Sequence, residues 1–127
     1  MTLDSSALIA VLFAEPGYLD IIDSILEAHH VRVGAPTLVE TSLVFAGRRG
    51  KAAGEVEGLV EEVGITVVPF GEAEGRLAAD AFLKFGRRRH KAALNFGDCL
   101  AYASASAAGD TLLFVGNDFR KTDIAPG

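Results

Sequence analysis

Cysteine is almost absent from this sequence of 127 residues, which contains Cys99 and no other. A single thiol can form neither an internal disulfide nor a zinc site built from several cysteines. Because disulfides are common in secreted proteins and rare in the reducing cytoplasm, the composition favours a cytoplasmic location. The first four residues include no basic residue and already carry the charge of Asp4, so we also expect no secretory signal peptide.

Long apolar runs and an excess of positive charge are missing as well. No segment approaches the roughly 20 consecutive apolar residues of a membrane-spanning helix, so we expect no association with a membrane. The 12 lysines and arginines are outnumbered by 17 aspartates and glutamates, which gives a net charge of −5. This balance argues against broad, non-specific binding of nucleic acid. It does not exclude a nuclease, because an acidic metal site and a local basic patch can coexist in one protein.

Apolar residues are plentiful: they make up 50% of the sequence, and the mean hydropathy is +0.30. A chain of this length can bury roughly two-thirds of its unfolded surface and so fold without disulfides. We expect residues 1–127 to form a single domain. The positive hydropathy is high for a soluble monomer, and we therefore expect part of the apolar surface to lie against another protein chain.

Short apolar strands alternate with helical segments along the chain. We expect strands at residues 2–3, 31–33, 65–68 and 112–115, with a further one near residues 122–124. The spacing of apolar residues predicts helices at residues 7–12, 19–26, 36–49, 52–63, 72–85 and 95–108. This alternation is typical of an α/β sandwich with a parallel sheet between two layers of helices. Ligands of such sheets bind beyond the carboxyl ends of the strands.

Four acidic residues stand at strand ends or near the beginnings of helices. Asp4 and Asp118 follow the first and the fourth predicted strands, Asp98 lies in the first turn of the helix at 95–108, and Glu40 lies early in the helix at 36–49. Carboxylates gathered at one sheet edge repel each other, and a divalent cation removes that penalty. Hard oxygen ligands favour Mg²⁺ or Mn²⁺ over zinc. The pattern therefore predicts a metal site.

Each of these acids also has a purely structural interpretation. Asp4 could cap the first helix, and Asp98 stands three residues after Asn95, the spacing of a capping box. Glu40 could interact with the positive end of its helix, and Asp118 could be an ordinary turn residue beside Asn117. Four coincidences of this kind are less plausible than one shared site, so the constellation carries the prediction.

Four segments carry a family resemblance. They are the start Leu3-Asp4-Ser5-Ser6, the helix containing Glu40-Thr41-Ser42-Leu43-Val44, the stretch Asn95-Phe96-Gly97-Asp98-Cys99, and the strand at 112–114 that leads to Asp118-Phe119. Over its whole length the chain resembles the PIN-domain endoribonuclease toxins of bacterial VapBC toxin–antitoxin systems. The resemblance implies an α/β/α sandwich on a small parallel sheet and Mg²⁺-dependent cleavage of RNA, with Mn²⁺ as an alternative ion. It also implies a cognate VapB-like antitoxin and, together with the apolar composition, a homodimer.

The resemblance assigns roles to individual residues. Asp4 and Asp98 take the family's two best-established metal positions, and Glu40 takes the third acidic position. Ser6 matches a serine or threonine that the family keeps beside the acids. Many relatives carry an acid two residues before the terminal Asp-Phe pair, where this chain has Gly116, so the fourth carboxylate falls to Asp118. Hydrolysis by a metal-activated water follows from such a site and requires no pair of catalytic histidines.

A basic loop precedes the helix that carries Asp98. We predict that it binds phosphate groups of RNA, because guanidinium groups match phosphate oxygens, although a merely solvated loop is the alternative. Its residues are Arg87, Arg88, Arg89, His90 and Lys91.

Two other functional classes fit the sequence less well. Phosphotransferases of the haloacid-dehalogenase or response-receiver type need an aspartate where this chain has Ser6, or a late lysine where it has Gly116 and Asn117. A degenerate PIN-fold binding module without catalysis is the remaining alternative, and the retained acids argue against it.

Overall fold

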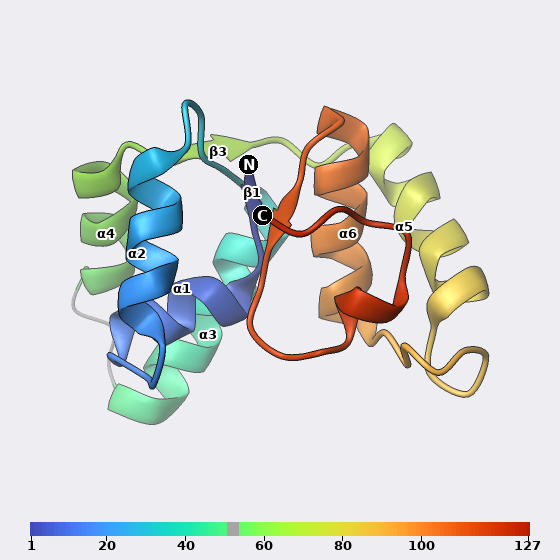
Figure 1. Ribbon diagram of the computed structural model, residues 1–127, viewed down its shortest axis with the longest axis horizontal. Coiled ribbons are helices and arrows are strands. Elements are labelled where there is room, and N and C mark those ends of the chain that lie inside the picture. The colour runs from blue at the N-terminus through green and yellow to red at the C-terminus, as the bar shows by residue number, and fades with distance from the viewer. Residues whose placement is uncertain (51–53) are drawn as a thin grey trace.

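The computed structural model describes residues 1–50 and 54–127 (Figure 1). In this part of the chain, four parallel strands form one sheet in the order β3-β2-β1-β4. Thr2 pairs with Arg32 on one side and with Leu112 on the other, so β1 lies in the middle of the sheet. The strands are β1 (Thr2–Leu3), β2 (Arg32–Gly34), β3 (Thr66–Val68) and β4 (Leu112–Leu113).

Helices cover both faces of the sheet, which confirms the predicted α/β/α sandwich. Figure 1 shows α1, α2 and α4 on one side of the strands and α5 and α6 on the other. Two clusters of buried apolar side chains lie along these helices, one on the side of α1, α2 and α4 and the other on the side of α5 and α6. The helices are α1 (Ser5–Leu12), α2 (Tyr18–Glu27), α3 (Ala35–Arg49), α4 (Glu55–Val63), α5 (Glu72–Phe85) and α6 (Phe96–Ala108).

Most predicted boundaries agree with the structure to within two residues. The helix predicted at residues 36–49 is α3, with Pro36 in its first turn, and Gly64 in a left-handed conformation (φ 76°) ends α4 before β3. The predicted start of α4 at residue 52 lies outside the described residues. None of the described helices is long and apolar enough to span a membrane.

The carboxyl-terminal region differs from the prediction in two places. The strand predicted at residues 112–115 ends at Leu113, because the backbone N–H of Val115 leaves the sheet and donates to the hydroxyl of Ser6 (3.0 Å). The strand predicted near residues 122–124 is wrong. The chain forms a short 3₁₀ helix just before this segment, η1 (Phe119–Lys121), and Thr122 Oγ1 then donates to the carbonyl of Phe119 (2.7 Å). The tail pairs with β4 two residues beyond the predicted strand, at an isolated parallel bridge between Pro126 and Leu112, where the Leu112 N–H donates to the carbonyl of Ala125 (2.9 Å).

Candidate active site

Asp4 stands directly at the carboxyl end of β1, where the central strand meets the first turn of α1. Its backbone N–H donates to the carbonyl of Leu113 (3.0 Å), and its side chain caps α1 by accepting the backbone N–H of Ser6 at Oδ2 (3.0 Å). The residue is buried, with 3% of its surface exposed, and Oδ1 has no hydrogen-bond partner. Burial raises the pKa of this carboxyl, and the nearby charge of Glu40 raises it further. The capping interpretation of Asp4 is therefore correct, and it leaves one buried oxygen unsatisfied.

Ser6 connects Asp4 to the loop that follows β4. The Ser6 hydroxyl donates to Asp4 Oδ2 (2.5 Å) and accepts the backbone N–H of Val115 (3.0 Å). One oxygen atom thus fixes the orientation of the Asp4 carboxylate and anchors the segment that leads to Asp118. The sequence singled out Ser6 only by family resemblance, and the structure supplies this physical reason for a hydroxyl at the position.

Asp98 lies in the first turn of α6 and closes the capping box that the sequence predicted. Its backbone N–H donates to Asn95 Oδ1 (2.8 Å), and its Oδ2 accepts the backbone N–H of Asn95 (3.0 Å). Burial raises the pKa of Asp98 to about 6, and the charges of Asp4, Asp118 and Glu40 add to the rise against the lowering effect of the Asn95 bond. The four predicted acids therefore lie close enough to act on one another.

Glu40 and Asp118 complete the acidic group from two further elements. Glu40 lies on α3, half-buried, and its carboxylate rests against Gly97 at the beginning of α6: a Cβ at Gly97 would lie 2.8 Å from Glu40 Cδ and 3.0 Å from Oε1. Asp118 is exposed and precedes η1 without making a side-chain cap bond. Asp118 thus lies at the rim of the group, whereas Asp4 lies at its buried centre.

The chemistry of this group fits a hard divalent cation. No arginine or lysine among the described residues forms an ion pair with Asp4, Glu40 or Asp98. The acids therefore lack positive charge, and the buried Oδ1 of Asp4 lacks a partner. Within residues 1–50 and 54–127, no three acidic, histidine or cysteine side chains are placed to hold a metal ion together. The site thus offers oxygen donors and unbalanced negative charge, but not a complete set of metal ligands.

The basic loop connects α5 to α6 and leads into the first turn of α6, which carries Asp98. Arg87, Arg88, Arg89 and Lys91 are exposed, and none of them forms an ion pair with a described residue. The guanidinium of Arg89 lies over the ring of Phe82, 5.7 Å from its centroid. Unlike the side chains of these four residues, His90 is held within the loop: its Nδ1 accepts the backbone N–H of Ala92 (3.0 Å), and its ring packs edge-on against Phe85.

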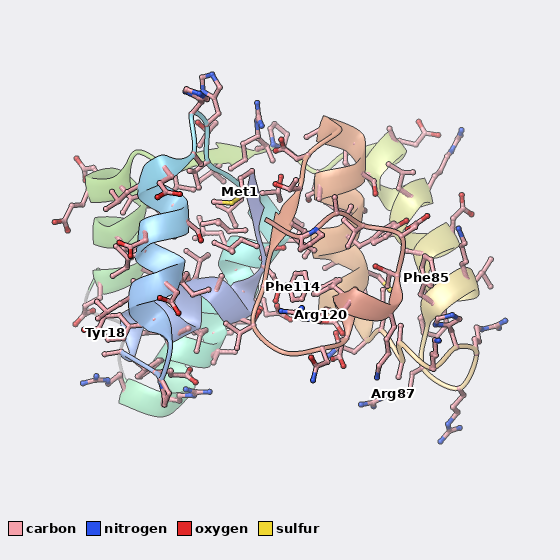
Figure 2. The ribbon with its side chains drawn as sticks, viewed as in Figure 1. Met1, Tyr18, Phe85, Arg87, Phe114 and Arg120 are labelled. Atoms are coloured by element: carbon pink, nitrogen blue, oxygen red, sulfur yellow. The ribbon has the colours of Figure 1, made fainter. Side chains whose placement is uncertain are left out.

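Arg120 was missed by the sequence reasoning. It is exposed and stands two residues after Asp118, and it lies nearer the middle of the view in Figure 2 than Arg87 does. Its position close to the predicted acid Asp118 in the sequence could have indicated it. A single arginine in a tail of mixed charge does not by itself predict a position near the acidic group.

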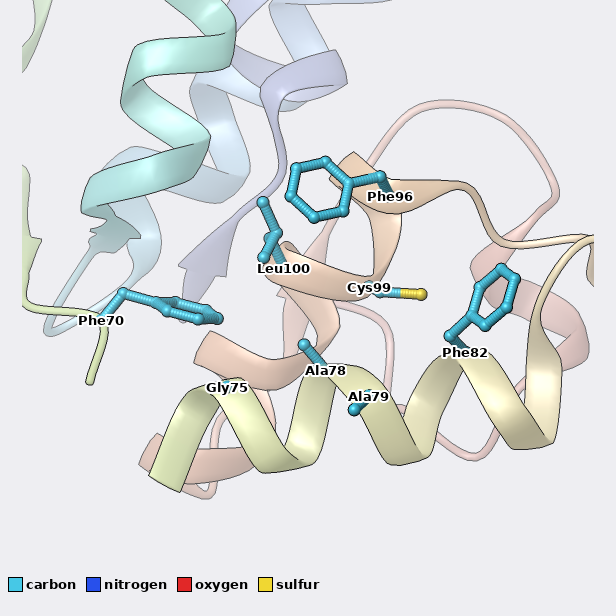
Figure 3. A pocket seen from close by; sticks show the side chains of 8 residues that line it. All are labelled: Phe70, Gly75, Ala78, Ala79, Phe82, Phe96, Cys99 and Leu100. Atoms are coloured by element: carbon cyan, nitrogen blue, oxygen red, sulfur yellow. The ribbon is translucent and has the colours of Figure 1, made fainter. Parts of the chain in front are cut away.

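An apolar groove of about 620 Å³ lies between α5 and α6 (Figure 3). The phenyl ring of Phe96, 78% exposed, lies at the groove two residues before Asp98. Cys99 is buried there, and burial together with the charge of Asp98 raises its pKa to about 11, so the thiol is protonated at neutral pH and is no nucleophile. The lining residues are Phe70, Gly75, Ala78, Ala79, Phe82, Phe96, Cys99 and Leu100.

Comparison with known proteins establishes the family. The sequence model of the PIN domain matches residues 1–125. Ribonuclease VapC36 of Mycobacterium tuberculosis is 39% identical over 126 residues, which cover 98% of this chain and 91% of that protein. The chain belongs to the PIN-domain family of VapC ribonucleases. Ribonuclease VapC of Mycolicibacterium smegmatis is 34% identical over 127 residues, with 98% of each protein covered, so the similarity to VapC ribonucleases extends over essentially the whole chain.

Solved structures agree with the PIN fold. The crystal structure of VapC20 of Mycobacterium tuberculosis, described as a toxin that cleaves the sarcin–ricin loop, superposes with a TM-score of 0.79 at 16% identity, covering 99% of this chain and 97% of that one. A toxin–antitoxin complex from Klebsiella pneumoniae gives a TM-score of 0.70 at 14% identity, covering 96% and 92%. At these identities the likeness concerns the fold alone.

Proposed function

We propose that this chain is a Mg²⁺-dependent endoribonuclease and the toxin component of a type II toxin–antitoxin system. The observation that supports the proposal is that the charges of Asp4, Glu40 and Asp118 all act on Asp98, while no lysine or arginine of the described residues forms an ion pair with Asp4, Glu40 or Asp98. In this proposal Asp4, Glu40 and Asp98 hold the ion, and Mn²⁺ can replace Mg²⁺. The relatives' names support the reaction, since they are ribonucleases.

The side chains of the site have different roles in the proposed hydrolysis. Bound Mg²⁺ would activate a water molecule for attack on phosphorus and balance the charge that develops on the phosphate. Ser6 holds Asp4 Oδ2, which leaves the unpartnered Oδ1 for the cation. Asp118, exposed at the rim, orients the attacking water. Because water attacks rather than a ribose hydroxyl, the 5′-phosphate stays on the downstream fragment and no histidine pair is needed.

The basic loop is the proposed contact with RNA. With a net charge of −5, the molecule as a whole repels a polyanion, so attraction must be local. Arg87, Arg88, Arg89 and Lys91 provide exposed positive charge just before α6, the helix that carries Asp98. We assign phosphates flanking the scissile one to these side chains, with His90 supporting the loop.

A VapB-like antitoxin is the proposed protein partner. The structural neighbours support this assignment, because one is a toxin–antitoxin complex and another is VapBC2 of Rickettsia felis bound to DNA from its promoter. The acidic group suggests how inhibition could work. An arginine of the antitoxin placed among Asp4, Glu40 and Asp98 would supply the missing positive charge and block RNA at once.

We also propose a homodimer, with the groove between α5 and α6 covered by a second copy of the chain. The groove is lined by apolar side chains, and Leu83 on α5 (59% exposed) adds to the exposed apolar surface. Monomers rarely expose contiguous apolar patches of this kind. Interfaces between permanently associated copies are more apolar than the rest of a protein surface.

Charge introduced into the groove is therefore expected to produce monomers. Phe82→Glu places a carboxylate on the proposed interface. Leu19→Glu places one on α2, on another face, at a residue that is more exposed (59% against 39%). Light scattering at micromolar concentration should give a dimer for the wild type and Leu19→Glu and a monomer for Phe82→Glu. A wild-type monomer, or equal behaviour of both variants, would rule out this interface.

Removal of divalent metal is expected to abolish cleavage of a single-stranded RNA. EDTA should reduce the rate to background, and excess Mg²⁺ or Mn²⁺ should restore it, because the clustered carboxylates supply only oxygen ligands. Circular dichroism before and after chelation serves as the control for folding. Undiminished cleavage in EDTA would contradict the proposed mechanism.

A further inference from the structure

Gly97 differs from the other glycines in described helices. Gly47, Gly58 and Gly75 lie in α3, α4 and α5, and an added Cβ at any of them meets nothing within 4 Å. At Gly97 an added Cβ would overlap the carboxylate of Glu40. Gly97 is therefore the helical glycine at which a side chain of another element fills the space that a methyl group would take.

The backbone does not require glycine at this position. Gly97 is the second residue of α6 and has no left-handed φ, so an L-residue fits its backbone conformation. Helix propensity does not favour glycine over alanine. An alanine methyl group would collide with the carboxylate of Glu40, which is the end of a flexible side chain, so the carboxylate would have to move.

The contact with Gly97 positions the carboxylate of Glu40, one of the proposed metal ligands. Gly97 directly precedes Asp98, and the charge of Glu40 acts on both Asp4 and Asp98. A methyl group at Gly97 would push the Glu40 carboxylate away from α6 without disturbing the bonds between Asn95 and Asp98, which involve other atoms. The space left by glycine therefore decides how near the third acid comes to the other two.

We propose that Gly97 is a positioning residue of the metal site: its missing side chain forms the recess that holds the Glu40 carboxylate against α6 beside Asp98. This inference rests on the proposed function, because it gives Glu40 a place among the metal ligands. It predicts that the glycine is needed for the affinity of the site rather than for folding.

The decisive experiment is a double-mutant cycle with Mg²⁺ affinity as the readout, measured from the Mg²⁺-dependent rise in melting temperature. Gly97→Ala is expected to weaken Mg²⁺ binding about 10- to 100-fold, the usual effect of disturbing the support of a ligand. In a Glu40→Ala background the same substitution should change the affinity by less than about twofold, because the recess then holds nothing. Gly47→Ala, in open space on α3, is the matched control and should leave the affinity unchanged.

Each outcome decides the proposal. Wild-type affinity in Gly97→Ala would overturn it, and so would a loss of equal size with and without Glu40, since Gly97 would then act on another group. If Gly97→Ala fails to fold, the proposal requires that Gly97→Ala/Glu40→Ala folds, and an unfolded double variant would refute it. Asp98→Asn distinguishes failure of the Gly97 proposal from failure of the proposed function. If that variant binds Mg²⁺ as well as the wild type, the proposed metal site itself is wrong.

Discussion

Asp98→Asn is expected to slow RNA cleavage by about 10²- to 10³-fold, because it removes a charged metal ligand at nearly constant volume and with it several kcal/mol of charge stabilisation. The amide can still accept the Asn95 N–H, so the helix cap and the fold should survive. Cleavage of a single-stranded RNA under single-turnover conditions measures the effect. A wild-type rate at saturating Mg²⁺ would show that Asp98 is not part of the site.

The same substitution should stabilise the metal-free protein at neutral pH. The pKa of Asp98 is raised from 3.8 to about 6, so its ionisation weakens the folded state as the pH rises through 6, and the full stability is present only below its ordinary pKa. A fully shielded group would account for about 3 kcal/mol, and the partial exposure of Asp98 reduces this to about 1–2 kcal/mol.

Urea unfolding in EDTA measures this effect, as the difference in unfolding free energy between Asp98→Asn and the wild type. The difference should be largest at pH 7 and should shrink as the pH falls from 6 towards 4. Taking the difference cancels the titrating groups that do not interact with Asp98. One of these is Asp110, whose pKa is lowered, against the opposing effect of burial, by its bonds to Thr2, Arg32 and the terminal amine. A wild type more stable than the variant at pH 7 would contradict the electrostatic account.

Replacement of Arg88 and Arg89 by alanine is expected to weaken RNA binding about 10- to 30-fold at low salt, taking about 1 kcal/mol for each phosphate contact. Each contact contributes roughly −0.7 to the slope of log affinity against log salt on single strands. The slope should therefore become shallower by about 1.4 when two contacts are lost. RNA affinity is measured in the Asp98→Asn background, in which cleavage is expected to be slow. Mg²⁺ affinity is measured with Asp98 intact and should stay unchanged.

The pair Arg48 and Arg49 gives a matched control with the same loss of charge. Both guanidinium groups lie over the ring of Phe13, at 4.9 and 5.2 Å from its centroid, and Arg48 also pairs with Glu15 (3.4 Å). Because these groups already have partners, their removal should affect RNA affinity less than removal of the loop arginines. Equal slopes for the wild type and the loop variant would show the loop to be a solvated surface, and the path of RNA would then be sought near Arg48 and Arg49.

The acids could be predicted from the sequence because short-range rules place them. Asp4 directly follows a strand, and Asp98 stands three residues after a capping asparagine, so their positions depend on only a few neighbouring residues. Glu40 could be assigned to its helix in the same way. The place of its carboxylate could not, because that place depends on the glycine at position 97, which lies far along the chain in another helix.

The carboxyl-terminal segment and the groove show where local patterns fail. The residues at 122–124 have the composition of a strand, but Asp123 accepts the hydroxyl of Tyr102 (2.5 Å) and the ammonium of Lys84 (3.2 Å), which fixes the segment on the helices. Phe82 and Phe96 have the apolar character of core residues, and nothing in their spacing indicates that they remain exposed. Both features depend on contacts between distant parts of the chain.

Magnesium binding to the wild type and to Asp98→Asn tests the central claim most directly, because it examines the acidic site without relying on a chosen RNA. Melting temperatures are recorded at pH 7 over a series of Mg²⁺ concentrations. A ligand that binds the folded state at about 100 times its dissociation constant stabilises it by about 2.7 kcal/mol. The account predicts a rising melting temperature for the wild type and a nearly constant one for Asp98→Asn. An equal rise in both proteins would place the metal elsewhere and contradict the account.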